Sequence, residues 1–442
     1  MKNLGLRDFL ELLQKSGELT RIAEQVSTEY ELAGVIDALG ERPVYFDNVT
    51  ESAVPVVAGL VSSKELICRA LGITREQLLP RLSSAIEGPV APSLVKDAAC
   101  QEVVYTGEDV DLAKLPIMRY TDKDGGKYIT SAVSIVKDPQ TGKQNMCFHR
   151  LMFKNRNHFI ARIVENRGTD SILKKTGGEL DIAICVGNST AVLLAAATSL
   201  PHGVDELGMA NALERTDVVK CKTVDINVPA DSEIVFEGKI TNEKASEGPF
   251  LDLTGVVDRI RQQPVIGINC LTHRKNPIYQ TILAGKNEHK FLMGMPKEPT
   301  IYNEVNKVCQ CKDVYITPGG CSWLHAVVQI HKTNADDGRK AIFAAFEGHK
   351  SLKHIVVVDE DINIYDPHDV EWAISTRFQA DKNLIVLSNQ SGSSLDPSGD
   401  LSEGKKATTA KAGIDATTPL LTTGKGFKKE EYLKVDLKKY VM

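Results

Sequence analysis

The sequence has no long apolar segment. Its most apolar run, residues 191–200, is too short to span a bilayer, and the first residues contain no apolar core of signal-peptide length. A transmembrane helix normally needs about 20 consecutive apolar residues. We therefore expect a cytoplasmic protein with no membrane partner.

Clusters of basic residues are also missing. The chain has 53 lysines and arginines and 58 acidic residues, interspersed along its length, and its formal net charge is -5. Proteins that bind nucleic acid usually concentrate basic residues in a patch or stripe, so we expect no nucleic-acid partner. A hydrophobic content of 42% over 442 residues instead predicts two or three globular domains with substantial cores.

Cysteine motifs are absent although the chain has nine cysteines. The only close pair, Cys309 and Cys311, lacks the two-residue spacer of zinc knuckles and redox motifs. We therefore expect reduced thiols, as in a reducing cytosol.

The first 110 residues are predicted to form an α/β domain. Apolar residues recur at helical spacing from Leu6 to just before Gly17, which predicts an amphipathic helix. Gln77 follows Thr74 by three residues, which is a capping-box signature at the start of a helix. The further helices are expected over residues 29–39, 63–71 and 74–82, and strands over residues 44–46 and 54–60.

Residues 111–296 carry a different pattern. Short β-branched runs separated by turns predict a mostly antiparallel sheet or barrel, and we expect this domain to hold a cofactor. A helix is expected over residues 188–199. The expected strands cover residues 130–137, 145–153, 158–164, 180–186, 218–228, 233–240 and 265–271.

Residues 297–442 return to the alternation of an α/β domain. The pattern predicts helices and strands in turn, and two strands joined by a helix make a right-handed βαβ unit. Residues 388–421 are rich in Ser, Gly, Asp, Thr and Lys and are expected to form a long loop. The elements before it are expected at residues 303–309, 323–331, 336–346, 355–358, 369–378 and 383–387.

The most suggestive loop covers residues 245–255, where Glu247 and Asp252 are separated by a Gly-Pro turn and two bulky apolar residues. The turn stiffens the loop, and the apolar residues shield part of it from water. Two carboxyl groups in such a setting can divide proton donation and charge stabilisation between them. The alternative is a solvated loop closed by the Gly-Pro turn.

Arginines occur in or beside predicted strands although the net charge is negative. Arg150 ends one such run, and Arg162 and Arg167 flank the next strand. Strand alternation places Phe148 on the face of Arg150, unless the strand bends. Guanidinium groups at these positions indicate an anionic ligand such as a phosphate, whereas the alternative for each of them is a surface ion pair.

These motifs occur in the order found in the UbiD family of prenylated-flavin-dependent decarboxylases, and the chain resembles that family over nearly its whole length. Each motif alone is a weak signal, but their common order is a strong one. The resemblance argues against the solvated-loop alternative for Glu247. The motifs are residues 6–10 with 17–19, Asn145 with Arg150, Arg167-Gly168, residues 205–207, residues 247–250 with Asp252, and residues 413–417.

The resemblance implies a metal and a cofactor. Asn145 and Glu206 match positions that bind a divalent metal, usually Mn2+, which bridges the protein to the cofactor phosphate, and K+ is a further candidate cation. The third ligand is usually a histidine, and this chain has Asn166 there, so the metal shell is expected to be altered, completed by water, or weaker. Prenylated FMN is implied to contact Phe148, His149, Arg150, Arg162, Ile163, Val164, Arg167 and Gly168.

The resemblance also implies three catalytic residues, Arg150, Glu247 and Asp252, with Asp252 as the proton donor. Prenylated FMN accepts the electron pair that decarboxylation leaves, and an acid then returns a proton to the same carbon. The implied fold is α/β (α+β). It combines an N-terminal α/β domain (1–110), a split-barrel domain for the flavin and metal (111–296) and a C-terminal α/β oligomerisation domain with an extended tail (297–442).

The short C-terminal region, the cysteine content and Asn166 favour one archaeal branch of the family, which converts trans-anhydromevalonate 5-phosphate to isopentenyl phosphate. One alternative is a reversible decarboxylase of hydroxybenzoate-type aromatic acids. Another is a non-catalytic flavin-binding accessory protein. The resemblance further implies a homodimer or higher homo-oligomer, a small carboxylic acid substrate, and a flavin prenyltransferase that supplies the cofactor.

Overall fold

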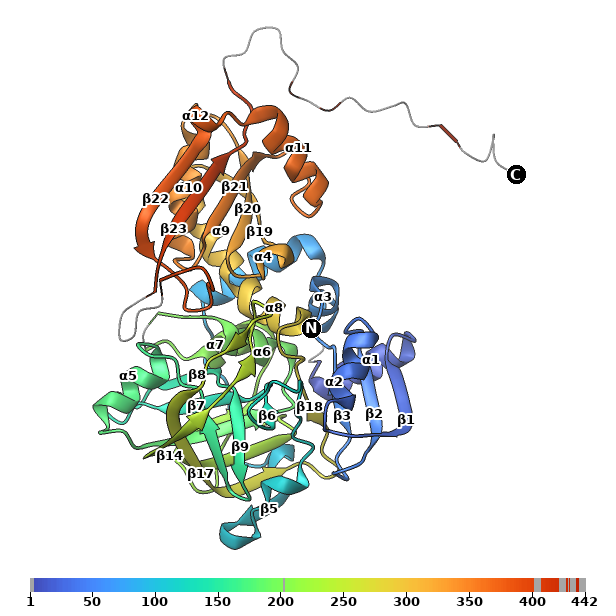
Figure 1. Ribbon diagram of the computed structural model, residues 1–442. Helices are drawn as coiled ribbons and strands as arrows, with labels where there is room; N and C mark the ends of the chain where they lie inside the picture. The colour runs from blue at the N-terminus through green and yellow to red at the C-terminus, as the bar shows by residue number, and fades with distance from the viewer. Residues whose placement is uncertain are drawn as a thin grey trace. The chain divides into compact units, whose positions relative to one another are not determined.

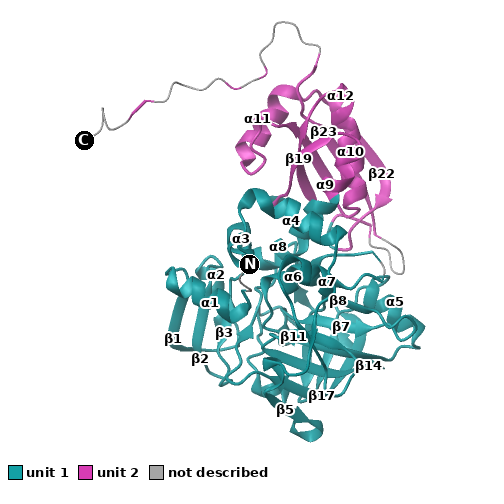
Figure 2. Ribbon diagram, turned by 180° about the vertical axis from the view of Figure 1, so that it is seen from behind, with its two compact units in different colours: residues 1–300, 318–323, 395–397 teal, residues 301–317, 324–394, 398–442 magenta. Residues whose placement is uncertain are grey.

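The computed structural model describes residues 4–201, 203–400, 407–420, 427, 429 and 435–436 (Figure 1). The chain divides into two compact units, coloured separately in Figure 2. The first contains residues 1–300, 318–323 and 395–397, and the second contains residues 301–317, 324–394 and 398–442. The expected domain boundary at residue 110 lies within the first unit, so the division into three domains stays a prediction.

The N-terminal part of the first unit is a four-stranded sheet with the order β1-β2-β3-β18. Strand β18 comes from much later in the chain and pairs with β3 in parallel. Strand β1 was not predicted, because its side chains show no apolar alternation and only Val26 is buried. The strands are β1 (Thr20–Val26), β2 (Val44–Val49), β3 (Val56–Ala58) and β18 (Tyr279–Gln280).

The helices of this part confirm the predictions made from local patterns. They are α1 (Leu6–Lys15), α2 (Glu31–Ala38), α3 (Lys64–Leu71) and α4 (Arg75–Glu87). Helix α1 buries one apolar face against the sheet, and Leu13 on that face is inaccessible to solvent. The capping box of α4 also forms, since the Thr74 N–H donates to Gln77 Oε1 at 2.9 Å.

The centre of the first unit is a nine-stranded sheet in which neighbouring strands run antiparallel, as predicted. Its order is β6-β9-β10-β17-β14-β11-β7-β8, and β5 pairs with β17. The strands are β5 (Val103–Thr106), β6 (Tyr128–Ile129), β7 (Val133–Lys137), β8 (Gln144–Phe148), β9 (Leu151–Asn155), β10 (His158–Ala161), β11 (Leu180–Val186), β14 (Ile234–Glu247) and β17 (Arg261–His273).

Two predicted strands are each divided in the structure. The prediction of one strand over residues 145–153 was wrong, because the chain changes partner at His149 and Arg150: β8 pairs with β7, whereas β9 pairs with β10 and β6. Strict alternation therefore does not extend from Phe148 to Arg150. Residues 218–228 likewise form two short strands, β12 (Val218–Lys220) and β13 (Asn227–Pro229), which pair with each other, and β12 also pairs with β4 (Leu94–Val95).

Four helices belong to this part of the unit, and two of them begin at predicted site residues, Gly168 and Glu206. They are α5 (Gly168–Lys175), α6 (Thr190–Ala197), α7 (Glu206–Leu213) and α8 (Asn287–Gly294). Helix α6 is buried along nearly its whole length, which explains why it is the most apolar run of the chain. No helix among the described residues is long and apolar enough to cross a membrane. All nine cysteines are free thiols, as expected.

The second unit is built on a five-stranded sheet with the order β19-β20-β21-β23-β22. Strands β20 and β21 are parallel neighbours joined through α10, as in a βαβ unit. The βαβ unit expected from the strands at residues 355–358 and 383–387 was wrong, because β23 lies between β21 and β22 and runs antiparallel to β22. The elements are α9 (Glu298–Asn306), which begins in the first unit, β19 (Gln310–Ile316), β20 (His325–His331), α10 (Asp337–Gly348), β21 (His354–Asp359), α11 (Pro367–Arg377), α12 (Ala380–Asn383), β22 (Leu384–Ser391) and β23 (Thr408–Asp415).

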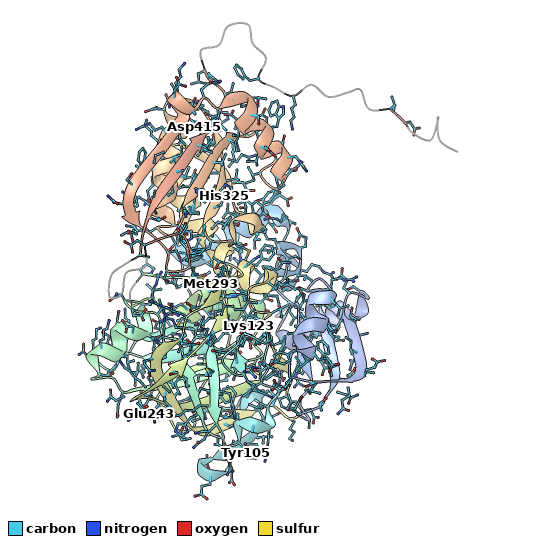
Figure 3. The ribbon with its side chains drawn as sticks, in the orientation of Figure 1. Tyr105, Lys123, Glu243, Met293, His325 and Asp415 are labelled. Atoms are coloured by element: carbon cyan, nitrogen blue, oxygen red, sulfur yellow. The ribbon has the colours of Figure 1, made fainter. Side chains whose placement is uncertain are left out.

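The expectation of a long loop over residues 388–421 was wrong where the structure describes that stretch. Strand β22 continues to Ser391, and residues 408–415 form the inner strand β23. Asp415 at the end of β23, labelled in Figure 3, accepts hydrogen bonds from the backbone N–H and the hydroxyl group of Thr417 at 3.1 and 2.6 Å. Polar composition concealed this strand because its stabilising contacts come from its neighbours in the sheet.

Candidate active site

Arg150 lies at the point where β8 ends and β9 has not yet begun, and it contacts three carboxylates. Its Nε and one terminal nitrogen donate to the two oxygens of Glu247 at 2.8 and 3.0 Å. The other terminal nitrogen donates to Asp252 at 2.8 Å, and a fourth hydrogen bond reaches Asp258 at 2.9 Å. The structure therefore brings together the three residues predicted to be catalytic, and it adds a fourth.

The carboxylates come from one continuous segment that folds back on itself. Glu247 ends β14, Asp252 follows β15 (Phe250–Leu251), and Asp258 ends β16 (Val257–Asp258), which pairs with β15. Glu247 is inaccessible to solvent, and the side chains of Asp252 and Asp258 are 15% and 16% exposed. The solvated-loop alternative for Glu247 is therefore wrong.

Aromatic packing and backbone hydrogen bonds fix this segment against residues 120–128. The Arg150 guanidinium lies 4.7 Å from the centre of the Phe250 ring, which in turn contacts the Tyr128 ring at 4.6 Å. The Gly248 N–H donates to the Tyr128 hydroxyl at 3.1 Å, and the Gly125 N–H donates to the Pro249 carbonyl at 2.8 Å. A Cβ atom on Gly125 would lie 2.0 Å from the Gly248 carbonyl oxygen, so this close approach requires glycine.

The cluster keeps its guanidinium charged. Burial acts to lower the pKa of Arg150, but its hydrogen bonds to Glu247 and the charges of the three carboxylates raise it overall. Burial likewise acts to raise the pKa of Asp258, but a hydrogen bond from Arg261 and the charge of Arg150 lower it. Asp258 thus belongs to two ion pairs, one with each arginine. The sequence offered no spacing signal for Asp258, because its role depends on β16 folding back onto β15.

His289 on α8 is a second residue that the sequence did not indicate. Its Nδ1 accepts a hydrogen bond from the Gly285 N–H at 3.1 Å, so the proton of the neutral ring is on Nε2. Burial lowers the pKa of His289; the nearby charge of Asp252 acts against this shift, and that of Arg150 adds to it. A neutral histidine with one fixed N–H donor therefore lies close to the proposed acid.

The residues predicted to bind a metal lie beside the ends of α5 and α7. Glu206 is the first residue of α7 and is 7% exposed, and one of its oxygens accepts a hydrogen bond from the Met146 N–H at 2.7 Å. Burial raises the pKa of Glu206 to about 8. Asn145 packs against the start of α5 so closely that a Cβ atom on Gly168 would lie 1.5 Å from its Oδ1. Glu206 has no basic ion-pair partner among the described residues, which fits a position for a bound cation.

Asn166 is placed differently from these two residues. It is exposed, has a positive φ of 61°, and uses its backbone N–H to donate to Asp170 at 2.7 Å. Among the described residues, no hydrogen bond links it to Asn145 or Glu206. Its role as a metal ligand stays a prediction.

The remaining residues predicted to contact the cofactor lie between the end of β8 and the start of α5. Phe148 is half-buried at the end of β8, and His149 is buried, with its pKa lowered to about 4 by burial and its Nε2 3.0 Å from the Thr169 hydroxyl. Arg162 pairs with Glu165 at 3.1 Å. Ile163 is buried and Val164 exposed, Arg167 is the N-cap residue of α5, and Gly168 is its first residue.

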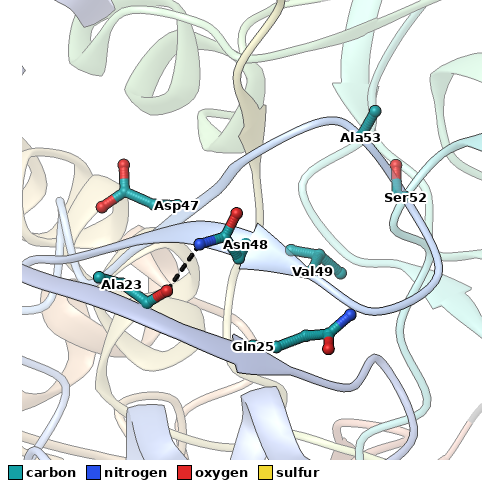
Figure 4. Close-up of a pocket in the computed structure, with 7 residues that line it drawn as sticks. All are labelled: Ala23, Gln25, Asp47, Asn48, Val49, Ser52 and Ala53. Carbon is teal, nitrogen blue, oxygen red and sulfur yellow. Dashed lines mark hydrogen bonds between the residues drawn. The ribbon is translucent and has the colours of Figure 1, made fainter.

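Two surface hollows lie outside the carboxylate cluster. The larger, of about 430 Å³, lies on β1 and β2 beside Asn48, whose amide donates to the Ala23 carbonyl at 2.6 Å (Figure 4). Its one acidic side chain, Asp47, is paired with Arg21. The second, of about 310 Å³, is lined by Gln144 and Asp205, the sequence neighbours of Asn145 and Glu206. Only the second hollow therefore lies beside predicted site residues.

Family models match three consecutive parts of the chain. They describe the N-terminal, Rift-related and C-terminal domains of 3-octaprenyl-4-hydroxybenzoate carboxy-lyase and cover residues 10–86, 93–287 and 290–416. The chain belongs to the UbiD family. This membership confirms the family and the carboxy-lyase class predicted from the sequence.

Two curated archaeal relatives within the UbiD family share one name. The chain is 43% identical to the anhydromevalonate phosphate decarboxylase of Methanosarcina mazei, over 94% of this chain and 96% of that protein. It is 40% identical to the protein of the same name from Methanothermobacter thermautotrophicus, over 95% of this chain and 98% of that protein.

Solved structures of the UbiD class confirm the fold. The HmfF enzyme of Pelotomaculum thermopropionicum, solved in complex with FMN, is 37% identical with a TM-score of 0.92, and the match covers 99% of this chain and 100% of that chain. The apo 3,4-dihydroxybenzoic acid decarboxylase of Enterobacter cloacae is 26% identical with a TM-score of 0.90, and the match covers 100% and 99% of the two chains.

Proposed function

We propose that this protein is a prenylated-FMN-dependent decarboxylase that converts trans-anhydromevalonate 5-phosphate to isopentenyl phosphate. The observation that carries the proposal is the buried cluster of Arg150, Glu247 and Asp252 in a chain 43% identical to an archaeal anhydromevalonate phosphate decarboxylase. A flavin-binding accessory protein would have no use for an acid held beside an arginine in this way. The cluster therefore favours an enzyme over that alternative.

Prenylated FMN, when bound, supplies the electron sink for the pair of electrons that the departing carbon dioxide leaves behind. The residues present fit such a group. The absence of a side chain at Gly168 lets the Asn145 amide pack at the start of α5, and Glu206 is a buried carboxylate without a basic partner among the described residues. Oxygen ligands of this kind suit Mn2+ or another hard divalent cation beside a phosphate.

Asp252 is the group that we assign as the proton donor. The cluster contains three carboxylates but only two guanidinium groups, those of Arg150 and Arg261, so one carboxylate can take up a proton while each arginine keeps an ionised partner. Glu247 is held by two hydrogen bonds from Arg150, and Asp258 is held by both arginines, whereas Asp252 receives a single guanidinium hydrogen bond. Asp252 is also partly exposed, so it can reach a substrate carbon.

The other members of the cluster fix Arg150, the cationic partner of this acid. Arg150 is clamped by Glu247 and covered by Phe250, so its position does not depend on a bound ligand. A group fixed in advance loses little entropy when the reaction begins. The Nε2–H group of His289 provides a neutral donor close to Asp252, suited to a carboxylate or carbonyl oxygen of the substrate.

The assay uses protein produced together with a flavin prenyltransferase and handled without oxygen. We expect carbon dioxide release and isopentenyl phosphate from trans-anhydromevalonate 5-phosphate, and much slower turnover of the unphosphorylated acid. A parallel assay uses 4-hydroxybenzoate and 3,4-dihydroxybenzoate. Turnover of the benzoates without turnover of the phosphorylated acid would favour an aromatic-acid decarboxylase instead. Absence of any turnover by the cofactor-loaded protein would contradict both.

We also propose that the protein binds Mn2+ or another divalent metal, with K+ as a further cation, and that it assembles as a homodimer or higher homo-oligomer. The buried Glu206 supports the metal, and closed symmetric assembly is common among enzymes of this size. Elemental analysis of protein purified with its flavin tests the metal. Light scattering at micromolar concentration tests the assembly, and a monomer mass would contradict it.

A further inference from the structure

Lys297 is a half-buried lysine whose hydrogen-bond partner carries no charge. It ends the short turn of residues 295–297 that follows α8, and its Nζ donates to the Ser199 hydroxyl at 2.9 Å. Among the residues that the structure describes, no carboxylate pairs with it. The next residue, Glu298, is held by Lys64 through hydrogen bonds of 2.6 and 2.8 Å. The nearest carboxylate in the sequence is therefore already engaged.

A second cation lies close to Lys297. Burial and the nearby charge of Arg167 lower the pKa of Lys297 to about 8. Arg167 is itself exposed at the start of α5, and no acidic partner for it occurs in the described part of the chain. Two positive groups brought together in this way repel each other, and desolvation makes the charge of Lys297 more costly still. Such an arrangement is stabilised when an anion lies between them.

The position of this cation pair indicates the kind of anion. Arg167 immediately precedes Gly168, which packs against the side chain of Asn145. Arg167 thus places the pair near the start of α5, next to the proposed metal position. The Lys297 ammonium group and the Ser199 hydroxyl lie within hydrogen-bond distance of each other, and the Arg167 guanidinium is near enough for its charge to act on Lys297. A phosphate monoester accepts hydrogen bonds from all three kinds of donor.

We propose that Lys297, Arg167 and Ser199 form a binding site for a phosphate monoester. The site rests on the proposed function and deepens it, since two such groups would be present in the working enzyme. One is the phosphate of the flavin, and the other is the phosphate of the substrate. A lysine provides a point charge that can reach either one, and the two sources are separated by experiment.

The test compares Lys297→Met, which keeps the length of the side chain but removes its charge, with the unchanged protein. Binding of FMN and of riboflavin to the flavin-free protein is measured by quenching of flavin fluorescence. Steady-state kinetics of the cofactor-loaded enzyme then give KM for the phosphorylated acid and for its unphosphorylated form. Lys174→Ala is the matched control, because Lys174 is an exposed lysine of the same region that pairs with Asp170 at 2.6 Å.

If the site holds the flavin phosphate, Lys297→Met weakens FMN binding about tenfold to a hundredfold and leaves riboflavin binding unchanged. If it holds the substrate phosphate, FMN binding stays the same and KM rises by a similar factor for the phosphorylated acid alone. Lys297→Arg restores most of either loss, because the charge returns. Equal effects of Lys297→Met and Lys174→Ala on both measurements would overturn the proposal.

The flavin arm separates this inference from the proposed function. The FMN-binding measurement needs no decarboxylation. If FMN binding depends on Lys297 but the protein decarboxylates nothing, the proposed phosphate site is supported and the proposed function is contradicted. If the Lys297→Met variant decarboxylates the phosphorylated acid and binds FMN as well as the unchanged protein, the proposed function is supported and the proposed phosphate site is contradicted. Thermal unfolding of each variant checks that it is folded.

Discussion

Replacing Arg150 by Met removes the one positive group that holds Glu247. The methionine side chain fills much of the same space and packs against Phe250, which lies 4.7 Å from the guanidinium. Glu247, however, is inaccessible to solvent and loses both of its guanidinium hydrogen bonds, of 2.8 and 3.0 Å. Asp258 keeps its ion pair with Arg261, and Asp252 is partly exposed to water. The loss of folding stability is therefore determined by Glu247.

Protonation of Glu247 in the variant limits how much folding stability is lost. Leaving one partner of a buried ion pair alone costs about 3–5 kcal/mol. A glutamate in an unfolded chain has a pKa of about 4.3, so placing a proton on it at pH 7 costs about 3.7 kcal/mol. When the charged form costs more than this, the folded variant takes up the proton instead. We therefore expect a loss of about 3–4 kcal/mol at pH 7.

The same argument gives the sign of the pH dependence. In the variant, folding binds a proton that the unfolded chain does not hold at pH 7, so stability falls by about 1.4 kcal/mol for each unit of rising pH above about 4.3. The difference between the variant and the unchanged protein should therefore shrink towards acidic pH. Calorimetry at pH 5, 6 and 7 measures it as a lowering of Tm on the order of 5–10 °C at pH 7.

The double variant Arg150→Met/Glu247→Gln provides the control. Glutamine cannot be charged, so the unpaired buried carboxylate is gone, and we expect most of the lost stability and the steep pH dependence to disappear. The single variant Glu247→Gln isolates the effect of that change. A loss that is the same at pH 5 and pH 7, or a double variant no more stable than Arg150→Met, would refute the reasoning.

Three further predictions concern individual groups. Asp252→Asn should lower kcat by roughly 10²–10⁴ while FMN binding, measured by fluorescence, is unchanged; near-native turnover would remove it as the acid. Glu206→Gln should reduce the bound divalent metal found by elemental analysis, because a carboxylate ligand is lost, and full metal occupancy would contradict its assignment. The pKa of Lys297 is lowered to about 8, so the charge that attracts a phosphate is lost as pH rises above that value, and affinity for the phosphate ligand should fall there. Lys297→Arg, whose guanidinium stays protonated, should show no such fall.

Elements defined by local periodicity could be predicted from the sequence. Helix α1 and strand β11 (Leu180–Val186) lie where apolar spacing places them, because a helix or strand with one buried side repeats its pattern within ten residues. The capping box at Thr74 likewise depends on residues three positions apart. The order of the motifs around Arg150, Glu247 and Asp252 also identified the family, because it covers most of the chain.

The features that depend on contacts between distant segments could not be predicted. Nothing between residues 145 and 153 marks the change of partner at Arg150, since each half is a reasonable strand by itself. Strand β23 has a polar sequence, and its position between β21 and β22 decides its conformation. Asp258 and His289 reach the cluster only through the folding back of β16 and the placement of α8.

The change of strand partner at Arg150 has a mechanistic consequence. A side chain within a regular strand would point to one face of the sheet and meet mainly its cross-strand neighbours. Arg150 instead lies between β8 and β9, outside either strand. Its side chain can therefore contact both the end of β14 and the segment of β15 and β16. Because Glu247 and Asp258 hold it from two sides, small movements of the loop around Asp252 need not displace it. The acid can therefore adjust to the substrate while its cationic partner stays fixed.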